Sequence, residues 1–132
     1  LEKLKDSFPN ATGAWTQEAP LAGGEMSGRA FSEWFVDLCR LQAGFATEDL
    51  LRLARRYGTR VDALLDGAKS AADLGPNLGG DLTAAEVRFL KATEWAQTVD
   101  DVLWRRTKAG LHVGTDQRAT LARRVDEVLS GS

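Results

Sequence analysis

Two residue types with a strong tendency to carry nucleophilic or acid–base chemistry, cysteine and histidine, occur once each in this sequence, as Cys39 and His112. They are the only cysteine and the only histidine, so neighbouring positions supply neither a Cys–His nucleophile pair nor a metal site of the usual ligands. Cys39 lies in an apolar run with helical spacing, and His112 has no orienting partner close in the sequence. We expect a buried, inert thiol and a loop histidine, and we assign no catalytic and no metal-binding residue.

A glycine-rich stretch, residues 74–81, is a candidate phosphate-binding loop. A dinucleotide-binding loop needs the spacing G-x-G-x-x-G between a strand and a helix. Here the spacing differs, Pro76 interrupts it, and no strand is predicted before it. The same test excludes Gly23 and Gly24. The sequence predicts a surface loop that leads into a helix, and it predicts that this chain binds no cofactor.

Two arginines and two tryptophans, Arg105, Arg106, Trp95 and Trp104, are the most suggestive of the remaining residues. Arg105 has an acidic partner four residues earlier, Asp101, a spacing that stabilises a helix by about 0.2–0.5 kcal/mol. The planar guanidinium group also suits bidentate pairing with a carboxylate across an interface. We expect Trp104 to pack inward and at least one arginine to point outward. The four residues are candidate inter-domain or structural anchors rather than substrate ligands.

Helical spacing dominates the chain that must position these residues, and no segment alternates with period two for long enough to form a strand. Residues 1–8 have the pattern of the end of a helix stopped by Pro9, within an irregular linker that covers residues 1–27. The sequence predicts an all-α fold, a compact bundle of about six helices. The predicted helices cover residues 28–43, 48–57, 60–69, 84–95, 99–109 and 116–129.

Threonines at five predicted helix starts can act as N-caps. They are Thr47, Thr59, Thr83, Thr98 and Thr115. Thr83 and Thr98 each precede an acidic residue by three positions, which is the spacing of a capping box. Lys108 is expected in the last turn of the helix at 99–109, and Gly110 at its C-terminal cap.

Composition excludes several classes of protein. A length of 132 residues is enough for one domain with its own core. The formal net charge of −2 disfavours nucleic acid as the main partner. The single cysteine predicts a reducing, cytoplasmic location. No apolar run approaches the ~20 residues that span a bilayer, so direct membrane insertion is not expected.

The segment Glu86–Leu111, EVRFLKATEWAQTVDDVLWRRTKAGL, resembles very closely the C-terminal region of the FAD-dependent (aerobic, respiratory) glycerol-3-phosphate dehydrogenases. Members of that family carry a string of the form EVxYLVxxEWAxTxxDVLWRRTKxGL. Two further segments match more loosely and in the right order. They are APLAGGE at residues 19–25, where Ala22 and Glu25 replace the usual proline and aspartate, and RRYG at residues 55–58.

The resemblance implies a parent enzyme whose N-terminal part, absent from this chain, binds FAD and oxidises sn-glycerol 3-phosphate to glycerone phosphate. Electrons would then pass to quinone in the cytoplasmic membrane, on which the parent would lie peripherally. Residues 28–132 would be a helical C-terminal domain that caps or braces the catalytic body and is inactive alone. Its expected partners are the FAD domain and, in addition, a second copy in a homo-oligomer. A start at Leu1 instead of methionine fits such a C-terminal piece.

Two other functions fit the residues. Residues 50–69 match a helix-turn-helix nucleic-acid binder, with Gly58 at the turn. The would-be recognition helix, RVDALLDGAK, carries as many acidic as basic side chains and so lacks the basic face that phosphates require. The arginines of residues 52–56 are interpreted as a solvated face. A free-standing helical adaptor with an apolar groove for a partner helix is the other alternative.

Overall fold

The computed structural model describes Ser7, Asn10 and residues 15–131. The helix tail expected at residues 1–8 therefore lies almost entirely outside the described residues. The described elements follow one another in the order α1 (Phe31–Leu41), α2 (Thr47–Tyr57), the 3₁₀ turn η2 (Gly58–Arg60), α3 (Val61–Leu64), the 3₁₀ turn η3 (Ala71–Leu74), β1 (Asn77–Gly79), β2 (Leu82–Thr83), α4 (Ala84–Thr93), the π-helical segment η4 (Asp101–Arg106), the 3₁₀ turn η5 (Ala109–Leu111) and α5 (Thr115–Ser130).

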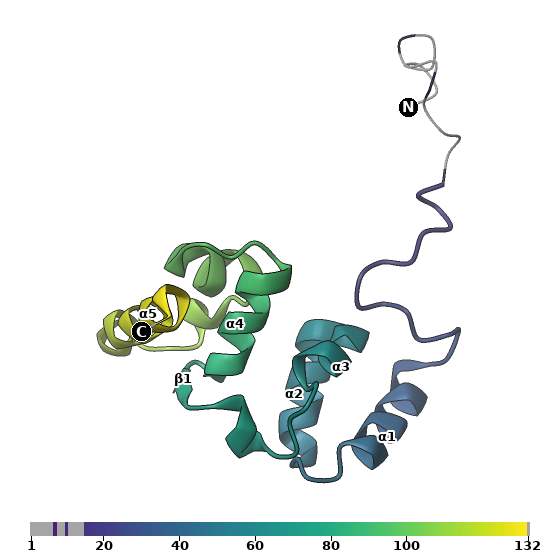
Figure 1. Cartoon of the computed structure of the whole chain (residues 1–132), viewed down its shortest axis with the longest axis horizontal. Helices are drawn as coiled ribbons and strands as arrows, with labels where there is room; N and C mark the ends of the chain where they lie inside the picture. The colour runs from purple at the N-terminus through teal and green to yellow at the C-terminus, as the bar shows by residue number, and fades with distance from the viewer. Residues whose placement is uncertain (1–6, 8–9, 11–14, 132) are drawn as a thin grey trace.

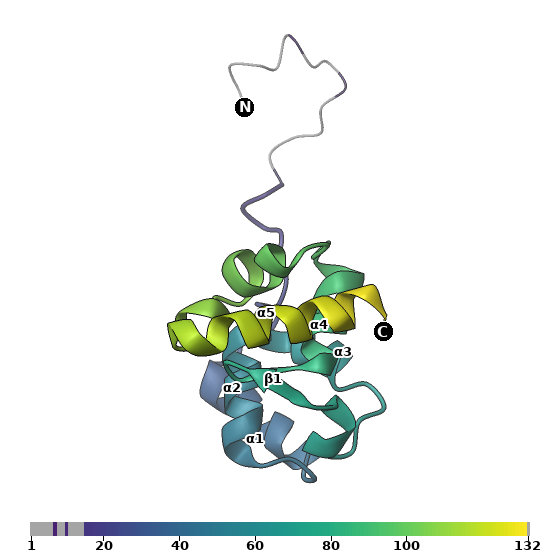
Figure 2. The same ribbon diagram turned by 90° about the vertical axis from the view of Figure 1, so that its left-hand side faces the viewer.

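The helices form two groups that meet along α2 and α4 (Figure 1). The first group holds α1, α2 and α3, and the second holds α4, η4 and α5. In the view of Figure 2, α5 lies across α4. A single apolar core runs through both groups because each helix buries one stripe of side chains. Its fully buried aliphatic residues include Leu50, Leu53, Val61, Val87, Leu90, Val102, Leu103, Leu121 and Val125.

The prediction of an all-α fold is confirmed, with one small addition. The surface loop predicted at residues 74–81 is largely an antiparallel hairpin of β1 and β2, in which Asn77 pairs with Thr83. Strands of three and two residues are too short to show a period of two in the sequence. The hairpin leads directly into α4 and places Thr83 at its N-terminus.

The helices predicted at 28–43 and 84–95 are shortened at their ends, to Phe31–Leu41 and Ala84–Thr93, and two others depart further from the prediction. The helix expected at 60–69 is a 3₁₀ turn followed by only four residues of α3. The helix expected at 99–109 becomes π-helical and ends at Arg106. The prediction that Gly110 caps this helix is wrong, because Lys108 is the residue in the left-handed conformation, with φ of 59°. Gly110 belongs to the following 3₁₀ turn, where it lies against the ring of Trp104.

The capping predictions are correct where a capping box was expected and wrong elsewhere. The Thr83 hydroxyl accepts the Glu86 N–H at 3.3 Å, and the Thr98 hydroxyl accepts the Asp101 N–H at 3.2 Å. The other three threonines are not N-caps. Thr47 and Thr115 are the first residues of their helices, after Ala46 and Gly114, and Thr59 lies inside a 3₁₀ turn. A lone threonine near a helix start therefore does not fix the start to within one residue.

Candidate functional site

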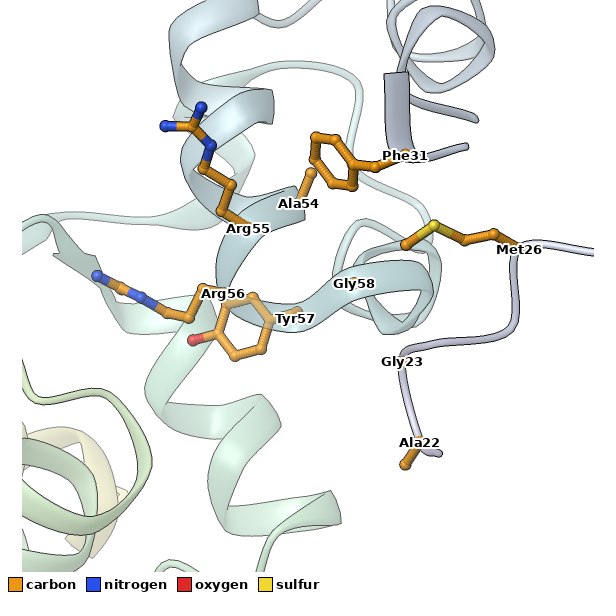
Figure 3. Close-up of a pocket in the computed structure, with 9 residues that line it drawn as sticks. All are labelled: Ala22, Gly23, Met26, Phe31, Ala54, Arg55, Arg56, Tyr57 and Gly58. Carbon is orange, nitrogen blue, oxygen red and sulfur yellow. The ribbon is translucent and has the colours of Figure 1, made fainter. Parts of the chain in front are cut away.

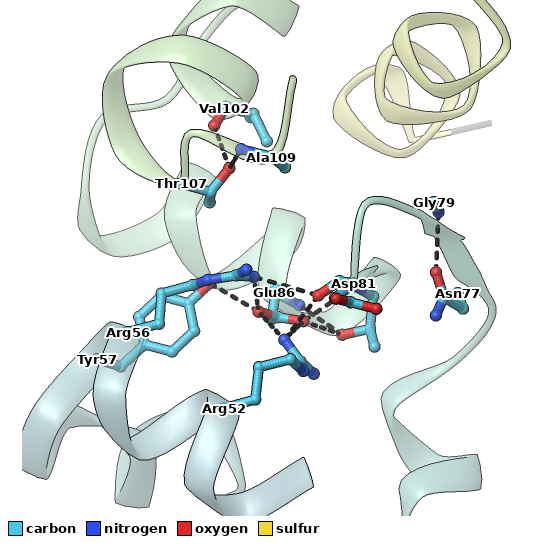
Figure 4. Close-up of polar contacts among 11 residues, drawn as sticks. Arg52, Arg56, Tyr57, Asn77, Gly79, Asp81, Glu86, Val102, Thr107 and Ala109 are labelled. Atoms are coloured by element: carbon cyan, nitrogen blue, oxygen red, sulfur yellow. Dashed lines mark hydrogen bonds and ion pairs between the residues drawn. The ribbon is translucent and has the colours of Figure 1, made fainter. Parts of the chain in front are cut away.

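Glu86, the third residue of α4, is fully buried and lies at the centre of a polar cluster (Figure 4). Thr83 donates its backbone N–H and its hydroxyl to one carboxylate oxygen, at 3.0 and 3.1 Å. The other oxygen accepts from the Tyr57 hydroxyl at 3.0 Å and from Arg56 at 2.7 Å. Arg52 reaches both oxygens, at 3.0 and 3.1 Å. The buried carboxylate is tolerated because it is both ion-paired and saturated with hydrogen bonds.

The two arginines of this cluster lie four residues apart on α2, so they share one face of the helix. Their side chains are 21% and 15% exposed, for Arg52 and Arg56. Both also donate to the backbone oxygen of Asp81, at 2.7 and 3.2 Å, and thereby tie α2 to the hairpin as well as to α4. Burial, and after it the charge of Glu86, raises the pKa of the Tyr57 hydroxyl well above its usual range. Tyr57 therefore remains a hydrogen-bond donor.

The interpretation of Arg52 and Arg56 as a solvated face is wrong, and sequence analysis missed this cluster. The signal in the sequence is two arginines one helical turn apart, followed by a tyrosine. That pattern indicates a face able to hold one anion. It does not indicate that the anion is Glu86, which lies 34 and 30 residues further along the chain.

A groove beside this cluster exposes the remaining positive charge, and we call it the arginine groove. It has a volume of about 520 Å³, is wide open to solvent, and is lined by Glu48, Leu51, Arg52, Arg55, Arg56 and Thr107. The side chain of Arg55 is exposed and has no hydrogen-bond or ion-pair partner among residues 15–131. The arginine groove therefore presents Arg55, which is unpaired within the described residues, beside the apolar side chain of Leu51.

A second pocket, on the other side of Arg55 and Arg56, is formed where the linker lies against the end of α2 (Figure 3). The Gly23 carbonyl accepts the Thr59 N–H at 2.9 Å. Gly58 is required at this contact for two reasons: its φ is +56°, and a Cβ atom there would lie 1.9 Å from the Gly23 oxygen. Gly23, which was rejected as part of a phosphate loop, lies at the same contact, because a Cβ atom there would lie 2.6 Å from the Tyr57 backbone oxygen.

Trp95 is presented to solvent by a tight turn after α4. Its side chain is 83% exposed, and its φ of 56° is left-handed, which bulky residues rarely adopt. The turn around it is firmly held, because Ala96 is fully buried and its N–H donates to the Leu90 oxygen at 3.2 Å. A strained backbone that displays a large aromatic ring is a recurrent feature of functional surfaces.

The second capping box stabilises the start of η4. Asp101 accepts the backbone N–H of Gln97 at 3.1 Å and that of Thr98 at 2.9 Å, and it pairs with Arg105 at 2.5 Å. The Arg105 hydrogen bond, followed by those of Thr98 and Gln97, holds the pKa of the Asp101 carboxyl well below its usual range. Arg105 is 64% exposed and satisfied within its own helix. The expected helical ion pair is present.

Trp104 packs inward, as predicted, although its ring is only half-buried. The Arg118 guanidinium lies 5.5 Å from the ring centroid, and a Cβ atom on Gly110 would come within 2.6 Å of the ring. Arg106 is exposed and has no partner within the described part of the chain. Trp95 and Trp104 do not form an aromatic pair among the described residues, so the structure separates the four candidate anchors into one that packs inward, Trp104, and three that are exposed, Trp95, Arg105 and Arg106.

The other candidate residues behave as ordinary structural side chains. His112 is exposed in the loop before α5, as expected. Cys39 is a free thiol, only partly buried, that packs against the core. The glycine-rich stretch forms part of the β1–β2 hairpin, so this stretch lacks the strand–loop–helix geometry of a dinucleotide-binding loop.

The helix-turn-helix interpretation is wrong. Its recognition helix corresponds to α3, which is only four residues long. The basic residues of the preceding helix are mostly directed inward to Glu86 and are not free to contact phosphates. Over residues 15–131, no helix is long and apolar enough to cross a lipid bilayer.

Comparison with known proteins identifies relatives over almost the whole chain. A family model described as the C-terminal domain of alpha-glycerophosphate oxidase matches residues 14–131. A glycerol-3-phosphate dehydrogenase of Pseudomonas aeruginosa is 47% identical over 123 residues, which are 92% of this chain and 23% of that protein. A D-erythritol 1-phosphate dehydrogenase of Brucella abortus is 40% identical over 120 residues, 90% of this chain and 24% of that protein.

An aerobic glycerol-3-phosphate dehydrogenase of Escherichia coli is 37% identical over 123 residues, 92% of this chain and 24% of that protein. The chain therefore spans about a quarter of the length of each of these relatives.

Proposed function

This chain belongs to the family of the C-terminal domain of alpha-glycerophosphate oxidase, and we propose that it is the helical C-terminal domain of an FAD-dependent glycerol-3-phosphate dehydrogenase. The parent enzyme oxidises sn-glycerol 3-phosphate to glycerone phosphate and passes the electrons to quinone. The observation that carries the proposal is a match over residues 14–131 to a family model and to dehydrogenases about four times longer. A peripheral position of the parent on the cytoplasmic membrane follows from the use of quinone.

The domain itself braces the catalytic body and carries no catalytic residue. In this proposal the flavin is bound by the part of the parent outside this chain, as the resemblance to FAD-dependent dehydrogenases implies. What this chain supplies is a rigid helical unit, locked across α2 and α4 by the buried Glu86 cluster.

Trp95 and Arg106 form the inter-domain contact in this proposal. Both are exposed, and Trp95 projects from a backbone that is strained and well anchored. Tryptophan and arginine are the residues most enriched at the energetic centres of interfaces. Trp104 and Arg105 have structural roles instead, because one packs on the core and the other pairs with Asp101.

The test is reconstitution of the parent from two pieces. This chain is mixed with the parent truncated before it, and both binding and glycerol-3-phosphate:quinone reductase activity are measured. We expect binding and a rise in activity, and we expect Trp95→Ala and Arg106→Glu to weaken both. The matched control is Leu41→Ala, because Leu41 is 79% exposed and apolar but lies at the end of α1. A truncated parent that is fully active and ignores this chain would contradict the proposal.

A second substrate is favoured by one observation, the 40% identity to a protein named D-erythritol 1-phosphate dehydrogenase. The parent would then oxidise a longer polyol phosphate. Assays of the full-length enzyme with sn-glycerol 3-phosphate and with D-erythritol 1-phosphate distinguish the two proposals. A higher kcat/KM with sn-glycerol 3-phosphate supports the first proposal, and a higher kcat/KM with D-erythritol 1-phosphate supports the second.

A further inference from the structure

The arginine groove carries more positive charge than the described residues neutralise. Arg52 and Arg56 share one carboxylate, Glu86, and their remaining contact is the uncharged backbone oxygen of Asp81. The Asp81 carboxylate forms no ion pair with either arginine in the part of the chain that the structure describes.

The rim of the groove adds Arg55 as a further cation and Glu48 as an anion. Glu48 makes no ion pair within residues 15–131, and it lies about two helical turns before Arg55, so it is not the partner of that arginine. Three arginines thus face two carboxylates, and one of those carboxylates is sealed beneath the surface. The net positive charge lies at the solvent-facing side, at Arg55.

The shape of the groove favours a protein side chain over a small molecule. Sites for small ligands enclose most of the ligand's surface, whereas this groove is wide open. Its exposed arginine is flanked by the apolar side chain of Leu51, and a planar guanidinium pairs best with a carboxylate in two parallel hydrogen bonds.

We infer that the arginine groove receives an acidic side chain from the catalytic part of the parent polypeptide, with Arg55 as its partner. This inference rests on the proposed function, because the partner lies in the roughly three-quarters of the relatives' length that this chain does not cover. It adds an electrostatic contact on α2 to the aromatic contact at Trp95. The charged contact fixes the orientation of the domain, and the tryptophan supplies apolar burial.

The direct test is a zero-length cross-link in the full-length parent that carries Arg55→Lys. A carbodiimide activates a carboxylate, and a lysine amine within contact distance displaces the urea leaving group to form an amide. Mass spectrometry of the digested protein then identifies the acidic residue. The control is Arg88→Lys, because Arg88 is also exposed and without a partner among the described residues, but lies on α4 outside the groove.

We expect an amide between position 55 and an aspartate or glutamate outside this chain, with much less product from position 88. The yield should fall as salt is raised to ~1 M, where the screening length is about 3 Å. Arg55→Glu should weaken binding in the two-piece assay on the order of tenfold, and Arg88→Glu should leave it unchanged.

Three results would overturn the inference. The first is unchanged binding of Arg55→Glu while the wild-type chain binds, which leaves the proposed function standing. The second is a cross-link from position 55 only to an isotope-labelled second copy of the parent, which would assign the groove to self-association. The third is thermal stabilisation by inorganic phosphate that Arg55→Glu abolishes without affecting binding, which would assign it to a small phosphorylated ligand. Failure of the wild-type chain to bind at all would remove the proposed function as well.

Discussion

The two capping boxes of this chain share one local design and differ in almost everything around it. In both, a threonine caps a helix, and the carboxylate of an acidic residue three positions later accepts a hydrogen bond from the threonine N–H. The distance is 3.0 Å for Glu86 and 2.9 Å for Asp101. Glu86 is fully buried and is paired by arginines from another helix. The Asp101 side chain is 17% exposed and is paired by Arg105 from its own helix, whose side chain is 64% exposed.

This difference shows how a local motif becomes a tertiary one. A carboxylate at the third position of a helix satisfies the same backbone donors wherever the helix lies. When the helix start is buried, the leftover charge must be neutralised by distant groups, and the box becomes a junction between elements. When the carboxylate is only partly buried and its partner is exposed, as Asp101 and Arg105 are, an arginine four residues away is sufficient.

The largest expected effect is the loss of the buried charge by Glu86→Gln. Arg52 and Arg56 would lose their counterion while remaining mostly buried, so the free energy of unfolding should fall by about 3–5 kcal/mol. The measurement is urea unfolding followed by circular dichroism. Asp101→Asn is the matched control, and it should cost clearly less because Arg105 is free to turn to solvent. Equal losses from the two substitutions would mean that burial does not separate the two boxes.

Substitution of Trp104 tests whether η4, the helix that begins at the Asp101 capping box, is stabilised by the packing of Trp104 against Gly110. Trp104→Ala should lower the free energy of unfolding by about 2–3 kcal/mol, below the roughly 3–5 kcal/mol of a fully buried tryptophan, because the side chain is only partly buried. Gly110→Ala should cost about 1–3 kcal/mol, because its methyl group meets the ring at 2.6 Å. In the Trp104→Ala background the cost of Gly110→Ala should nearly vanish. Additive losses in this double-mutant cycle would contradict the ring–glycine contact.

The pH dependence of stability provides a further comparison of the two capping boxes, because only the Glu86 box contacts a tyrosine, Tyr57. Tyr57→Phe should cost about 1–2 kcal/mol at neutral pH, through loss of the hydrogen bond to Glu86. The raised pKa of the Tyr57 hydroxyl adds a signature at alkaline pH. Above about pH 10 the unfolded chain releases this proton while the folded chain keeps it, so the wild type loses stability as pH rises and Tyr57→Phe does not.

The difference in free energy of unfolding between the wild type and Tyr57→Phe should therefore become smaller as pH rises above about 10. Urea midpoints from pH 7 to 11 measure it. A constant gap over that range would show that the hydroxyl is not shielded in the folded state.

The sequence predicted what is local and missed what is not. The helical fold, the two capping boxes and the Asp101–Arg105 pair were all visible because their partners lie within four residues of one another. The hairpin was missed because its strands are two and three residues long. The Glu86 cluster was missed because its ion pairs connect positions 30 and 34 residues apart, and spacing carries no information over that distance.

The candidate anchor residues also show that residue type alone does not predict where a side chain lies in the fold. Their residue types drew attention to Trp95 and Trp104 equally, yet one ring is exposed and the other packs against the core. The difference arises from backbone geometry. Trp95 lies in a left-handed turn after α4 has ended, whereas Trp104 lies inside η4. Neither the turn nor its handedness follows from the residue types, since tryptophan is among the side chains least suited to positive φ.

The smallest expected effect concerns the left-handed turn at Trp95. The experiment tests whether the backbone conformation that exposes the Trp95 ring lowers the stability of the fold. Trp95→Ala should hardly change the free energy of unfolding, because the side chain is 83% exposed. Trp95→Gly should be more stable than Trp95→Ala by about 0.5–1 kcal/mol. Glycine adopts a φ of 56° without the strain of about 1–2 kcal/mol that a Cβ atom causes, although it loses more entropy on folding. Urea unfolding of the two variants side by side measures the difference.

If Trp95→Gly is the less stable variant, the turn is unstrained, and the exposure of Trp95 does not lower the stability of the fold. If it is the more stable one, the wild-type chain keeps a residue that its own fold does not favour, as expected when a partner surface needs the ring.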